Sequence, residues 1–525
     1  MKFNRLFFIL IILTALALGL RVFNLQIRPM HTDEAVHAIK FGKLLEEGFY
    51  RYDKNEYHGP SLNYMTLLPA WLMSQNELNE TNEYTLRIVP VFIGIGLILL
   101  LLIIKSYINK TTLFLTAVLI TISPIMVFYS RYYIQEILLV FFTYGFIFTM
   151  IRLWYSKRII WALLTGICLG MMHATKETWI ISFGVLFFTT IILIFTNNVI
   201  RNEIGSRLKG NIRNLSVLIF TAIVISALFY SSFFKNPQGV IDSIAAFSNY
   251  FNKAGNFDRH IHPWYFYLGI LGYKQNPDFL WSEIFLLIAG LLGLLFLFKK
   301  KTGNSNQILR LIGIYSLTLG IIYSLLPYKT PWNILGFYYG WLILAGYGFS
   351  EIFKIKLSKS RKIALYIFLS VGMIHLIYQT YLSNFKYFAD PSNPYVYGHT
   401  SKDIFNLVDM TDQIIQVHPE GKNMMIEVIC ENHDYWPLPW YFRDYYQVGW
   451  WDEVNMDIAA APIIIASPVL EAHILQKLYE KPPPGQRYLY VPMFRKPVAL
   501  RPNVYLEGYV RKDVWDVYVQ KSSIE

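Results

Sequence analysis

Charged residues are scarce in this sequence: they make up 16% of its 525 residues, whereas soluble domains carry about 25%. Cysteine is scarcer still, with Cys168 inside an apolar run and Cys430 in the C-terminal part. A disulfide between them would have to join a membrane segment to a soluble tail, so we expect none. Hydrophobic residues reach 54%, which excludes an ordinary soluble protein and favours one that spans a membrane.

The net charge of +12 raises the question of a nucleic-acid partner. The lysines and arginines, however, are divided among short segments between apolar runs and form no single basic face. We therefore predict no nucleic-acid partner and interpret the basic residues as signals of membrane orientation.

Crossing a bilayer takes roughly 20 apolar residues in a helix. Eleven runs approach this length, and the fifth is the shortest: 6–26, 87–104, 112–129, 137–154, 159–173, 179–196, 215–234, 281–298, 310–326, 333–352 and 362–382. The first run follows Lys2 and Arg5, and no small-residue cleavage motif comes after it. We predict that it is an uncleaved signal anchor.

Starting from a cytoplasmic N-terminus, the alternation of spans places every strongly basic segment on one side. These segments are Lys105 to Lys110, Lys157 and Arg158, Arg201 to Arg213, Lys299 to Lys301, and Lys354 to Lys362. The opposite side receives residues 27–86 and 235–280, three short turns and the C-terminal tail. We therefore predict a multi-pass protein of the plasma membrane with an extracytoplasmic tail.

The sequence changes character after residue 383. Strand-like runs at 424–428, 462–466, 488–491 and 514–519 alternate with helical patterns. One helix is expected around Ile404 to Val408, and another after Ser467 and Pro468. We predict a membrane domain over residues 1–383 and a small extracytoplasmic α/β domain over residues 384–525.

The first outer loop opens with the string HTDEAVHA, which begins at His31 and directly follows a spanning run. Apolar and polar positions then recur with helical spacing up to Gly48, as expected of an amphipathic helix on the membrane surface. Acidic residues are favoured in a first helical turn, so capping alone would account for Asp33 and Glu34. A carboxylate at headgroup depth is nevertheless costly unless it has a function.

Further polar clusters fall on the same predicted side. They are EYHGPSLNY in the first loop, SRYYIQE from Ser130 to Glu136, HATKE from His173 to Glu177, and PYKTPW from Pro327 to Trp332. The spans themselves are nearly free of charge, whereas a transporter carries ionisable residues near its helix midpoints. The clusters therefore favour an enzyme that acts at one membrane face over a transporter.

In their order and sidedness these motifs resemble the GT-C superfamily of membrane glycosyltransferases, in the branch of protein O-mannosyltransferases and aminoarabinose transferases. HTDEAVHA is similar to the acidic pair of that family's first outer loop, SRYYIQE to its second-loop arginine and acid, and HATKE and PYKTPW to its lysine-bearing turns. EYHGPSLNY and PLPWYFRDY, from Pro437 to Tyr445, resemble a subfamily associated with prokaryotic surface glycans and their flippases. One departure is Glu136, where relatives often have aspartate.

The resemblance implies a GT-C-like polytopic α-helical fold with interfacial helices in the first outer loop. It also implies inverting transfer of a sugar, hexosyl or mannosyl, from a polyprenyl-phosphate-linked donor among the membrane lipids to a protein, lipid or glycan acceptor. Asp33 would take the acceptor's proton, with Glu34 and Glu136 as further catalytic residues. A nonenzymatic partner of a glycan flippase, which keeps the fold without turnover, is the alternative function.

Three basic residues, Arg131, Lys176 and Lys329, would bind the donor phosphate and stabilise it as a leaving group. Snorkelling toward lipid headgroups is the alternative for the two lysines. Tyr57 and His58 would bind substrate, while a histidine satisfied at the interface is the alternative for His58.

Two further groups of residues have open interpretations. His31, Asp33, His37 and Glu136 offer imidazole and carboxylate groups that suit a divalent metal, but their spacing does not favour one, and the sequence leaves the cofactor open. Trp436, Trp440 and Tyr441 would either hold glycan or pack the tail onto the membrane part.

Overall fold

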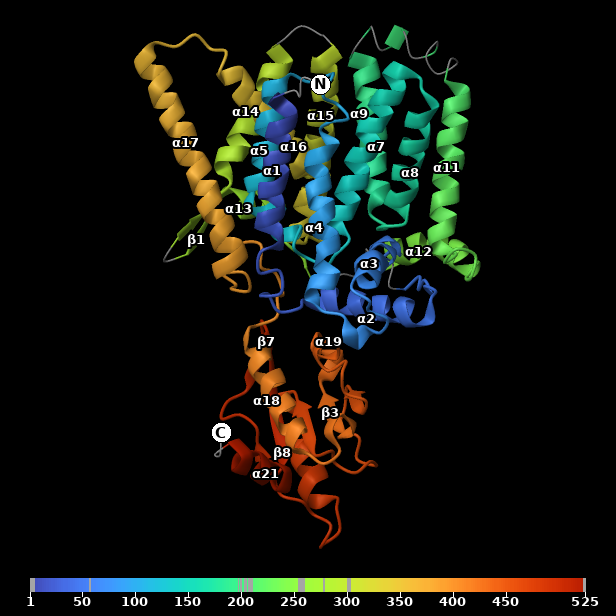
Figure 1. Cartoon of the computed structure of the whole chain (residues 1–525), viewed down its shortest axis with the longest axis vertical. Helices are drawn as coiled ribbons and strands as arrows, with labels where there is room; N and C mark the ends of the chain where they lie inside the picture. Colours follow the sequence, from blue (N-terminus) through green and yellow to red (C-terminus); the bar gives the residue numbers. More distant parts are fainter. Residues whose placement is uncertain are drawn as a thin grey trace.

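The computed structural model describes residues 5–55, 58–196, 211–253, 260–276, 279–299 and 304–522, together with residues 198, 201, 202 and 205. Long helices run side by side in one half of the molecule, and a small sheet with its own helices forms the other half (Figure 1). The two predicted classes of structure, an apolar helical bundle and a C-terminal sheet region, are therefore both present.

Each of the eleven apolar runs coincides with a helix. The helices are α1 (Arg5–Val22), α4 (Glu83–Leu100), α5 (Lys110–Ile122), α7 (Glu136–Ser156), α8 (Ile159–His173), α9 (Trp179–Thr196), α11 (Ile212–Tyr230), α14 (Ile284–Lys299), α15 (Asn304–Leu325), α16 (Ile334–Ile352) and α17 (Lys359–Tyr381). The third run is divided at Pro124, which begins the short helix α6 (Pro124–Tyr129), because proline fits the first turn of a helix better than its interior.

Within the described residues, six helices are long and apolar enough to cross a membrane: α4, α7, α9, α11, α15 and α17. Four more, α1, α5, α8 and α14, are apolar but shorter. Helix α16 is rich in glycine and aromatic residues. The count of eleven spans therefore stays a prediction.

Shorter helices lie at the end of the bundle that faces the sheet (Figure 1). They are α2 (Thr32–Glu47), α3 (Ser61–Leu72), α12 (Gln238–Lys253) and α13 (Phe266–Gly272). Beside α13, a hairpin pairs β1 (Lys274–Asn276) with β2 (Phe279–Trp281).

Helix α2 is the helix predicted for the first outer loop, and it ends as expected at Gly48, whose φ of 70° favours glycine. Its apolar face is not turned to lipid, because Ala35, Ala38 and Phe41 are fully buried. Helix α2 packs instead against α3 and against the short helix α19 (Leu438–Tyr441). Protein therefore covers the apolar face that was expected to meet lipid, and the position of α2 on the membrane surface stays a prediction.

The C-terminal part holds six strands within the described residues: β3 (Ile426–Ile429), β4 (Val448–Trp451), β5 (Ile463–Ala466), β6 (Tyr490–Pro492), β7 (Val498–Arg501) and β8 (Val504–Arg511). The sheet has the order β4-β3-β5-β8-β6, and β7 also pairs with β8. Strands β3, β4 and β5 are parallel, while β8 is antiparallel to its neighbours. Helices α18 (Asp403–Val417) and α21 (Lys512–Ser522) pack against each other.

Three of the four predicted strands are confirmed as β3, β5 and β6, and both predicted helices are present, the second as a helical stretch that includes α20 (Glu471–Leu475). The fourth strand, at 514–519, is wrong because this segment belongs to α21. Val514 and Tyr518 are four residues apart and both pack into the core, and Lys512 pairs with Asp516 one turn on. An alternating pattern this short fits one helical face equally well.

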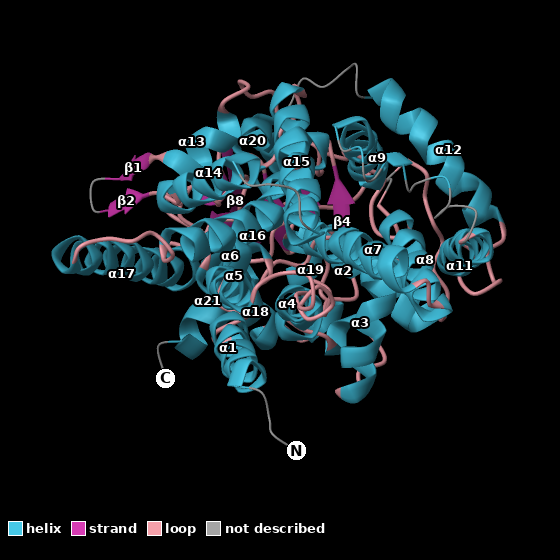
Figure 2. Ribbon diagram, turned by 90° about the horizontal axis from the view of Figure 1, so that it is seen from above, coloured by secondary structure: helices cyan, strands magenta, loops and turns pink. Residues whose placement is uncertain are grey.

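The sheet region is joined to the bundle by specific hydrogen bonds. Trp440 is fully buried and its Nε1 donates to Glu83 Oε1 at 2.8 Å, while Met30 N donates to the Tyr441 hydroxyl at 2.8 Å. Trp440 and Tyr441 therefore serve packing, the second of the two interpretations above. Viewed down the bundle, β4 and β8 fall within the outline of the helices (Figure 2).

Candidate functional site

The first turn of α2 separates its two acidic residues. His31 caps the helix: its Nδ1 accepts the Asp33 N–H at 3.0 Å, and its own N–H donates to Glu34 Oε2 at 3.1 Å. The Asp33 side chain remains 44% exposed, with Oδ2 lying 3.9 Å from His31 Nδ1. Asp33 is thus the carboxylate of the pair that a substrate can reach.

Glu34 is fully buried and paired with Arg87 of α4. The Arg87 fork donates from Nε to Oε1 and from Nη2 to Oε2, both at 2.8 Å, and Tyr133 N donates to Oε1 at 2.8 Å. Burial favours a raised pKa for Glu34, but the guanidinium groups of Arg87 and Arg28 outweigh it and lower the pKa to about 2. Both oxygens of Glu34 accept hydrogen bonds, so this residue positions the start of α2. Its part in catalysis stays a prediction.

Arg131 is committed to the end of α1. Its Nη1 donates to the carbonyls of Leu20, Arg21 and Phe23, and its Nη2 donates to the Asn24 carbonyl, at 2.7 to 3.1 Å. A cation at a helix C-terminus satisfies orphan carbonyls and the helix dipole. The hydrogen bonds of Arg131 go to these backbone carbonyls, as those of a capping residue do, and its binding of the donor phosphate stays a prediction.

Lys176 and Glu136 form a buried ion pair between the turn after α8 and the first residue of α7. Burial alone lowers the pKa of Lys176, but the carboxylates of Glu136 and Glu177 outweigh it, so the pKa lies above its usual range. The ammonium also lies within electrostatic range of Tyr328 in the PYKTPW turn. The predicted residues of two separate motifs therefore do meet here.

His58 and His37 lie beside this pair. His58 Nδ1 is 3.1 Å from Glu177 Oε2, and the His37 ring is 5.5 Å from the His58 ring. His37 Nδ1 is 3.3 Å from Gln135 Nε2, and burial, with the neighbouring His58, Lys40 and Lys176, holds its pKa well below the usual value. His37 is therefore a neutral imidazole. Tyr57, the other residue predicted to bind substrate with His58, lies outside the described residues.

Gly59 explains how the HATKE turn meets the EYHGPSLNY string. The Gly59 N–H donates to Thr175 O at 3.1 Å and the Ser61 N–H to Ala174 O at 2.9 Å, so the two segments pair through their backbones. A Cβ at Gly59 would lie only 2.2 Å from Ala174 O. Only glycine permits this approach, which places His58 next to Glu177.

Lys329 is buried in the turn between α15 and α16. Its Nζ donates to His262 O at 2.8 Å and also to Leu326 O, and its backbone N–H donates to His260 O at 3.0 Å. Pro331 begins a short 3-10 helix (Pro331–Asn333) that ends the turn. The turn holds the ammonium against the polypeptide, which argues against snorkelling into headgroups.

A chain of hydrogen bonds joins Lys329 to the helix that carries Asp33. His31 Nε2 lies 3.1 Å from Tyr397 O, and the Tyr397 hydroxyl lies 2.8 Å from His262 Nε2. The carbonyl of His262 in turn accepts from Lys329. The base candidate and the phosphate-binding candidate are thus held in one framework although 296 positions separate them in the sequence.

Aromatic rings fill the space around His31. Its ring lies 5.3 Å from Tyr132, 6.0 Å from Trp332 and 5.0 Å from His399, and His399 stacks on Tyr132. The guanidinium of Arg28 lies 4.7 Å from the centre of the Tyr132 ring. The first outer loop therefore rests on a rigid aromatic base.

The possible metal ligands are not brought together. Both ring nitrogens of His31 are hydrogen-bonded, His37 contacts Gln135, and Glu136 is paired with Lys176. Within the part of the chain that the structure describes, no three His, Cys, Asp or Glu side chains form a group that could hold a metal.

Several residues of the site escaped the sequence analysis. Arg87 could have been found from the sequence, because it is a charged residue at the start of an apolar run, where a charge needs a partner. Arg28 lies three residues before His31, outside the HTDEAVHA motif. Tyr397, His399 and His262 belong to segments without periodicity or motif, and only their contacts reveal them.

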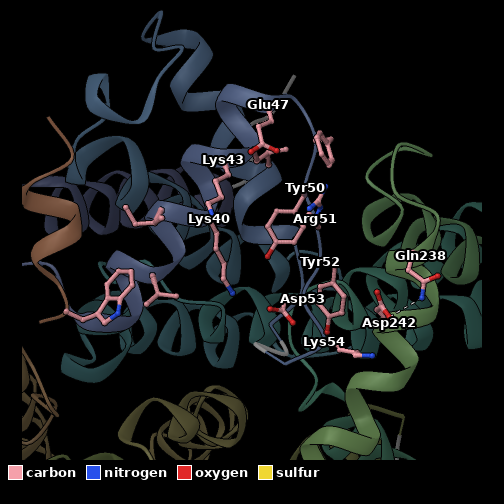
Figure 3. A pocket seen from close by; sticks show the side chains of 15 residues that line it. Lys40, Lys43, Glu47, Tyr50, Arg51, Tyr52, Asp53, Lys54, Gln238 and Asp242 are labelled. Carbon is pink, nitrogen blue, oxygen red and sulfur yellow. Dashed lines mark hydrogen bonds between the residues drawn. The ribbon is translucent and has the colours of Figure 1, made fainter. Parts of the chain in front are cut away.

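A polar cavity of about 710 Å³ lies beside α2 (Figure 3). Its walls come from α2, from the loop at 49–54 and from Gln238 and Asp242 of α12, with Trp436 of the C-terminal part as a further wall. Lys40, Lys43 and Glu47 line it along the helix. The polar face of α2 therefore forms one wall of this cavity.

Residues 11–236 match the sequence model of a family described as dolichyl-phosphate-mannose-protein mannosyltransferase. No curated protein matches the chain. The fold is similar to that of ArnT from Cupriavidus metallidurans, solved in the apo state and bound to undecaprenyl phosphate, with a TM-score of 0.60 and 13% identity over 95% of this chain and 97% of that one.

The fold is also similar to that of the oligosaccharyltransferase of Archaeoglobus fulgidus in its apo form, with a TM-score of 0.54 and 14% identity over 90% of this chain and 70% of that one. The family match, which includes Asp33, Arg131, Glu136 and Lys176, and the shared fold together relate this chain to the GT-C superfamily of membrane glycosyltransferases. The resemblance to this superfamily that the sequence motifs indicated is therefore confirmed.

Proposed function

We propose that this protein is an inverting glycosyltransferase that moves a sugar from a polyprenyl-phosphate-linked donor to an acceptor at the outer membrane face. The observation that carries the proposal is the hydrogen-bonded framework from His31 through Tyr397 and His262 to Lys329. It fixes a reachable carboxylate and a cation at the same end of an apolar bundle, as displacement of a lipid phosphate requires.

The donor side of the site is an apolar cavity of about 320 Å³ between α13, α15 and α16. Leu317, Ile321 and Leu325 line it along α15, and Phe337 and Trp341 line it along α16. Leu325 directly precedes Leu326, whose carbonyl accepts a hydrogen bond from Lys329. A polyprenyl chain in this cavity would bring its phosphate toward the ammonium of Lys329.

In the proposed reaction the acceptor oxygen or nitrogen forms a bond to the anomeric carbon of the donor sugar. The bond from that carbon to the phosphate oxygen breaks, and its electron pair stays on the phosphate, which Lys329 stabilises. Asp33 takes the acceptor's proton as the new bond forms. Attack opposite the leaving phosphate inverts the anomeric configuration.

The basic residues between the helices indicate how the protein is oriented in the membrane. The basic connections after α4, α7 and α16 lie at the end of the bundle remote from the sheet (Figure 1). We infer that this end is cytoplasmic, in the plasma membrane, and that residues 1–383 form the catalytic membrane domain and residues 384–525 an extracytoplasmic domain.

The test of this function is transfer by the purified protein. It is incubated with several radiolabelled polyprenyl-phosphate sugars and with membranes from the cells that make it. We expect label from at least one donor to appear in an acceptor, at a rate proportional to enzyme. No labelled acceptor with any donor would contradict a transferase and favour a nonenzymatic flippase partner.

Lys329→Met is expected to lower kcat/KM for the donor by a factor of about 10² to 10³, because the leaving phosphate loses its nearest cation. Initial rates at varied donor concentration measure this. Lys274→Met is the control, since that lysine also donates to a backbone carbonyl, Pro391 O at 2.9 Å, at the same end of the bundle. Equal kcat/KM values for the two variants would exclude Lys329 from donor binding.

Gly59→Ala is expected to lower transfer at least about tenfold, because the backbone pairing with Ala174 must open and displace the turn that holds Lys176 and Glu177. Transfer rate and melting temperature are measured together. Gly184→Ala in α9, where a Cβ meets nothing within 4 Å, should change neither. Full activity of the Gly59 variant would show that the turn's position does not matter.

A further inference from the structure

A second cavity, of about 460 Å³, adjoins the polar cavity beside α2. Ile39 of α2 and Trp436 line both, so the two cavities meet at these residues, between α2 and the C-terminal sheet. We call the two cavities together the acceptor groove. It is larger than a single sugar or amino-acid side chain needs.

Aromatic rings line the part of the groove nearest the sheet. Tyr435 and Trp450 lie 4.9 Å apart, Tyr446 is 69% exposed, and Trp436 is partly buried at the junction of the two cavities. Trp440, by contrast, is fully buried and takes no part. Ring faces at a wet surface suit the C–H faces of sugar rings, which pack on them while their hydroxyl groups stay hydrated.

The part nearest the bundle carries charges of both signs. Lys40, Lys43, Arg51 and Lys54 face the same cavity as Glu47, Asp53 and Asp242 (Figure 3). A sugar hydroxyl donates and accepts hydrogen bonds, so a mixed set of donors and acceptors matches a neutral polyhydroxyl chain. The four cations and three carboxylates nearly balance, so this part of the groove suits a neutral chain better than a strongly charged one.

Asp33 lies one helical turn before the first residue of α2 that lines the groove. Val36 and Lys40 line it and follow Asp33 by three and seven residues, so all three lie on one face of α2. At the other wall, Arg501 Nη1 donates to Thr32 Oγ1 at 2.9 Å and to Trp436 O at 3.3 Å. One guanidinium thus holds Trp436 beside the first turn of α2.

An extended peptide would need a different surface. Strand β4 is the edge of the sheet, and a peptide could pair with its free backbone groups. Val448 and Trp450 of β4, two residues apart, line the groove with their side chains. The groove therefore meets a side-chain face of the sheet and not its hydrogen-bonding edge.

We propose that the acceptor groove binds a preformed glycan chain of several neutral sugar residues, so that the enzyme extends an existing glycan instead of placing the first sugar on a protein. This inference rests on the proposed transferase function and adds the acceptor class to it. Trp436 is the specificity-determining residue: it packs against an inner sugar while the terminal hydroxyl reaches Asp33.

The acceptor is identified by what carries the label. After transfer from radiolabelled polyprenyl-phosphate sugars to cell membranes, the unreacted donor is separated by chromatography, because mild acid would release its sugar. Glycans are then released by alkaline β-elimination, hydrazinolysis and mild acid, and sized. We expect the label in oligosaccharides of several residues. Label released as a single sugar, from protein or lipid, overturns the glycan acceptor but leaves the transferase intact, whereas no label in any acceptor overturns both.

Trp436→Ala tests the groove itself. The rate of sugar transfer by this variant should fall about tenfold at limiting amounts of acceptor membranes and recover at saturating amounts, as expected when one stacked ring is lost. Tyr505→Ala on β8, which removes an aromatic ring that is 50% exposed away from the groove, should behave like wild type. An unchanged rate for Trp436→Ala at limiting acceptor, or an equal loss at saturating acceptor in a stably folded variant, contradicts the proposal.

Discussion

Asp33→Asn is expected to abolish sugar transfer, by a factor of about 10² to 10⁴, while the protein still folds. The asparagine has nearly the same shape and cannot take the acceptor's proton. Stability should persist because the carboxylate is 44% exposed, and the cap of α2 uses the Asp33 backbone N–H and not its side chain. Transfer rate and melting temperature in detergent measure the two effects.

The Asp33 variant also separates an enzyme from a nonenzymatic partner. A flippase partner would tolerate the change, so normal surface-glycan assembly in cells that carry only Asp33→Asn would exclude Asp33 as a catalytic base. A variant that is inactive and also melts many degrees lower would instead indicate a structural role.

Glu34→Gln, at the adjacent position, is expected to lower the stability of the protein, whereas Asp33→Asn is expected to lower sugar transfer and leave stability unchanged. Removing this buried carboxylate leaves the Arg87 guanidinium, itself fully buried, without its counter-charge, which costs about 3 to 5 kcal/mol. The start of α2 should loosen, and the melting temperature should fall well below that of Asp33→Asn. A Glu34→Gln protein as stable as wild type would contradict this account of the pair.

The pH dependence of the same pair has a definite sign. The folded-state pKa of Glu34, about 2, lies below the usual 4.5. Its contribution to stability is therefore fully present above about pH 4.5 and is lost as the pH falls through about 2. Melting temperatures of wild type and Glu34→Gln should differ by a constant amount from pH 7 to 5 and converge only at strongly acidic pH.

The helical part of the fold could be predicted because each apolar run is longer than the strand with which it could be confused. Eleven runs coincide with helices, and Gly48 ends α2 as expected. The segment at 514–519 could not be resolved, since a short alternation of apolar and polar residues fits either a strand or one face of a helix.

Only those residues of the site that belong to sequence motifs could be predicted. The sequence placed Asp33, Lys176 and Lys329 at one end of the bundle, but it could not show that Arg131 caps α1 or that Glu34 pairs with Arg87. Those partners are backbone carbonyls and a residue 53 positions away, and residue type does not reveal them. A charged residue beside a motif serves structure or chemistry according to contacts that only the fold creates.

The contacts of the first outer loop have a consequence for biosynthesis. His31 contacts Tyr397, 366 positions later, and Thr32 accepts a hydrogen bond from Arg501, 469 positions later. A nascent chain that has inserted its helices but has not yet released its last strands therefore lacks the contacts that fix the start of α2. Completion of the tail is thus the last step in building the site that the first loop carries.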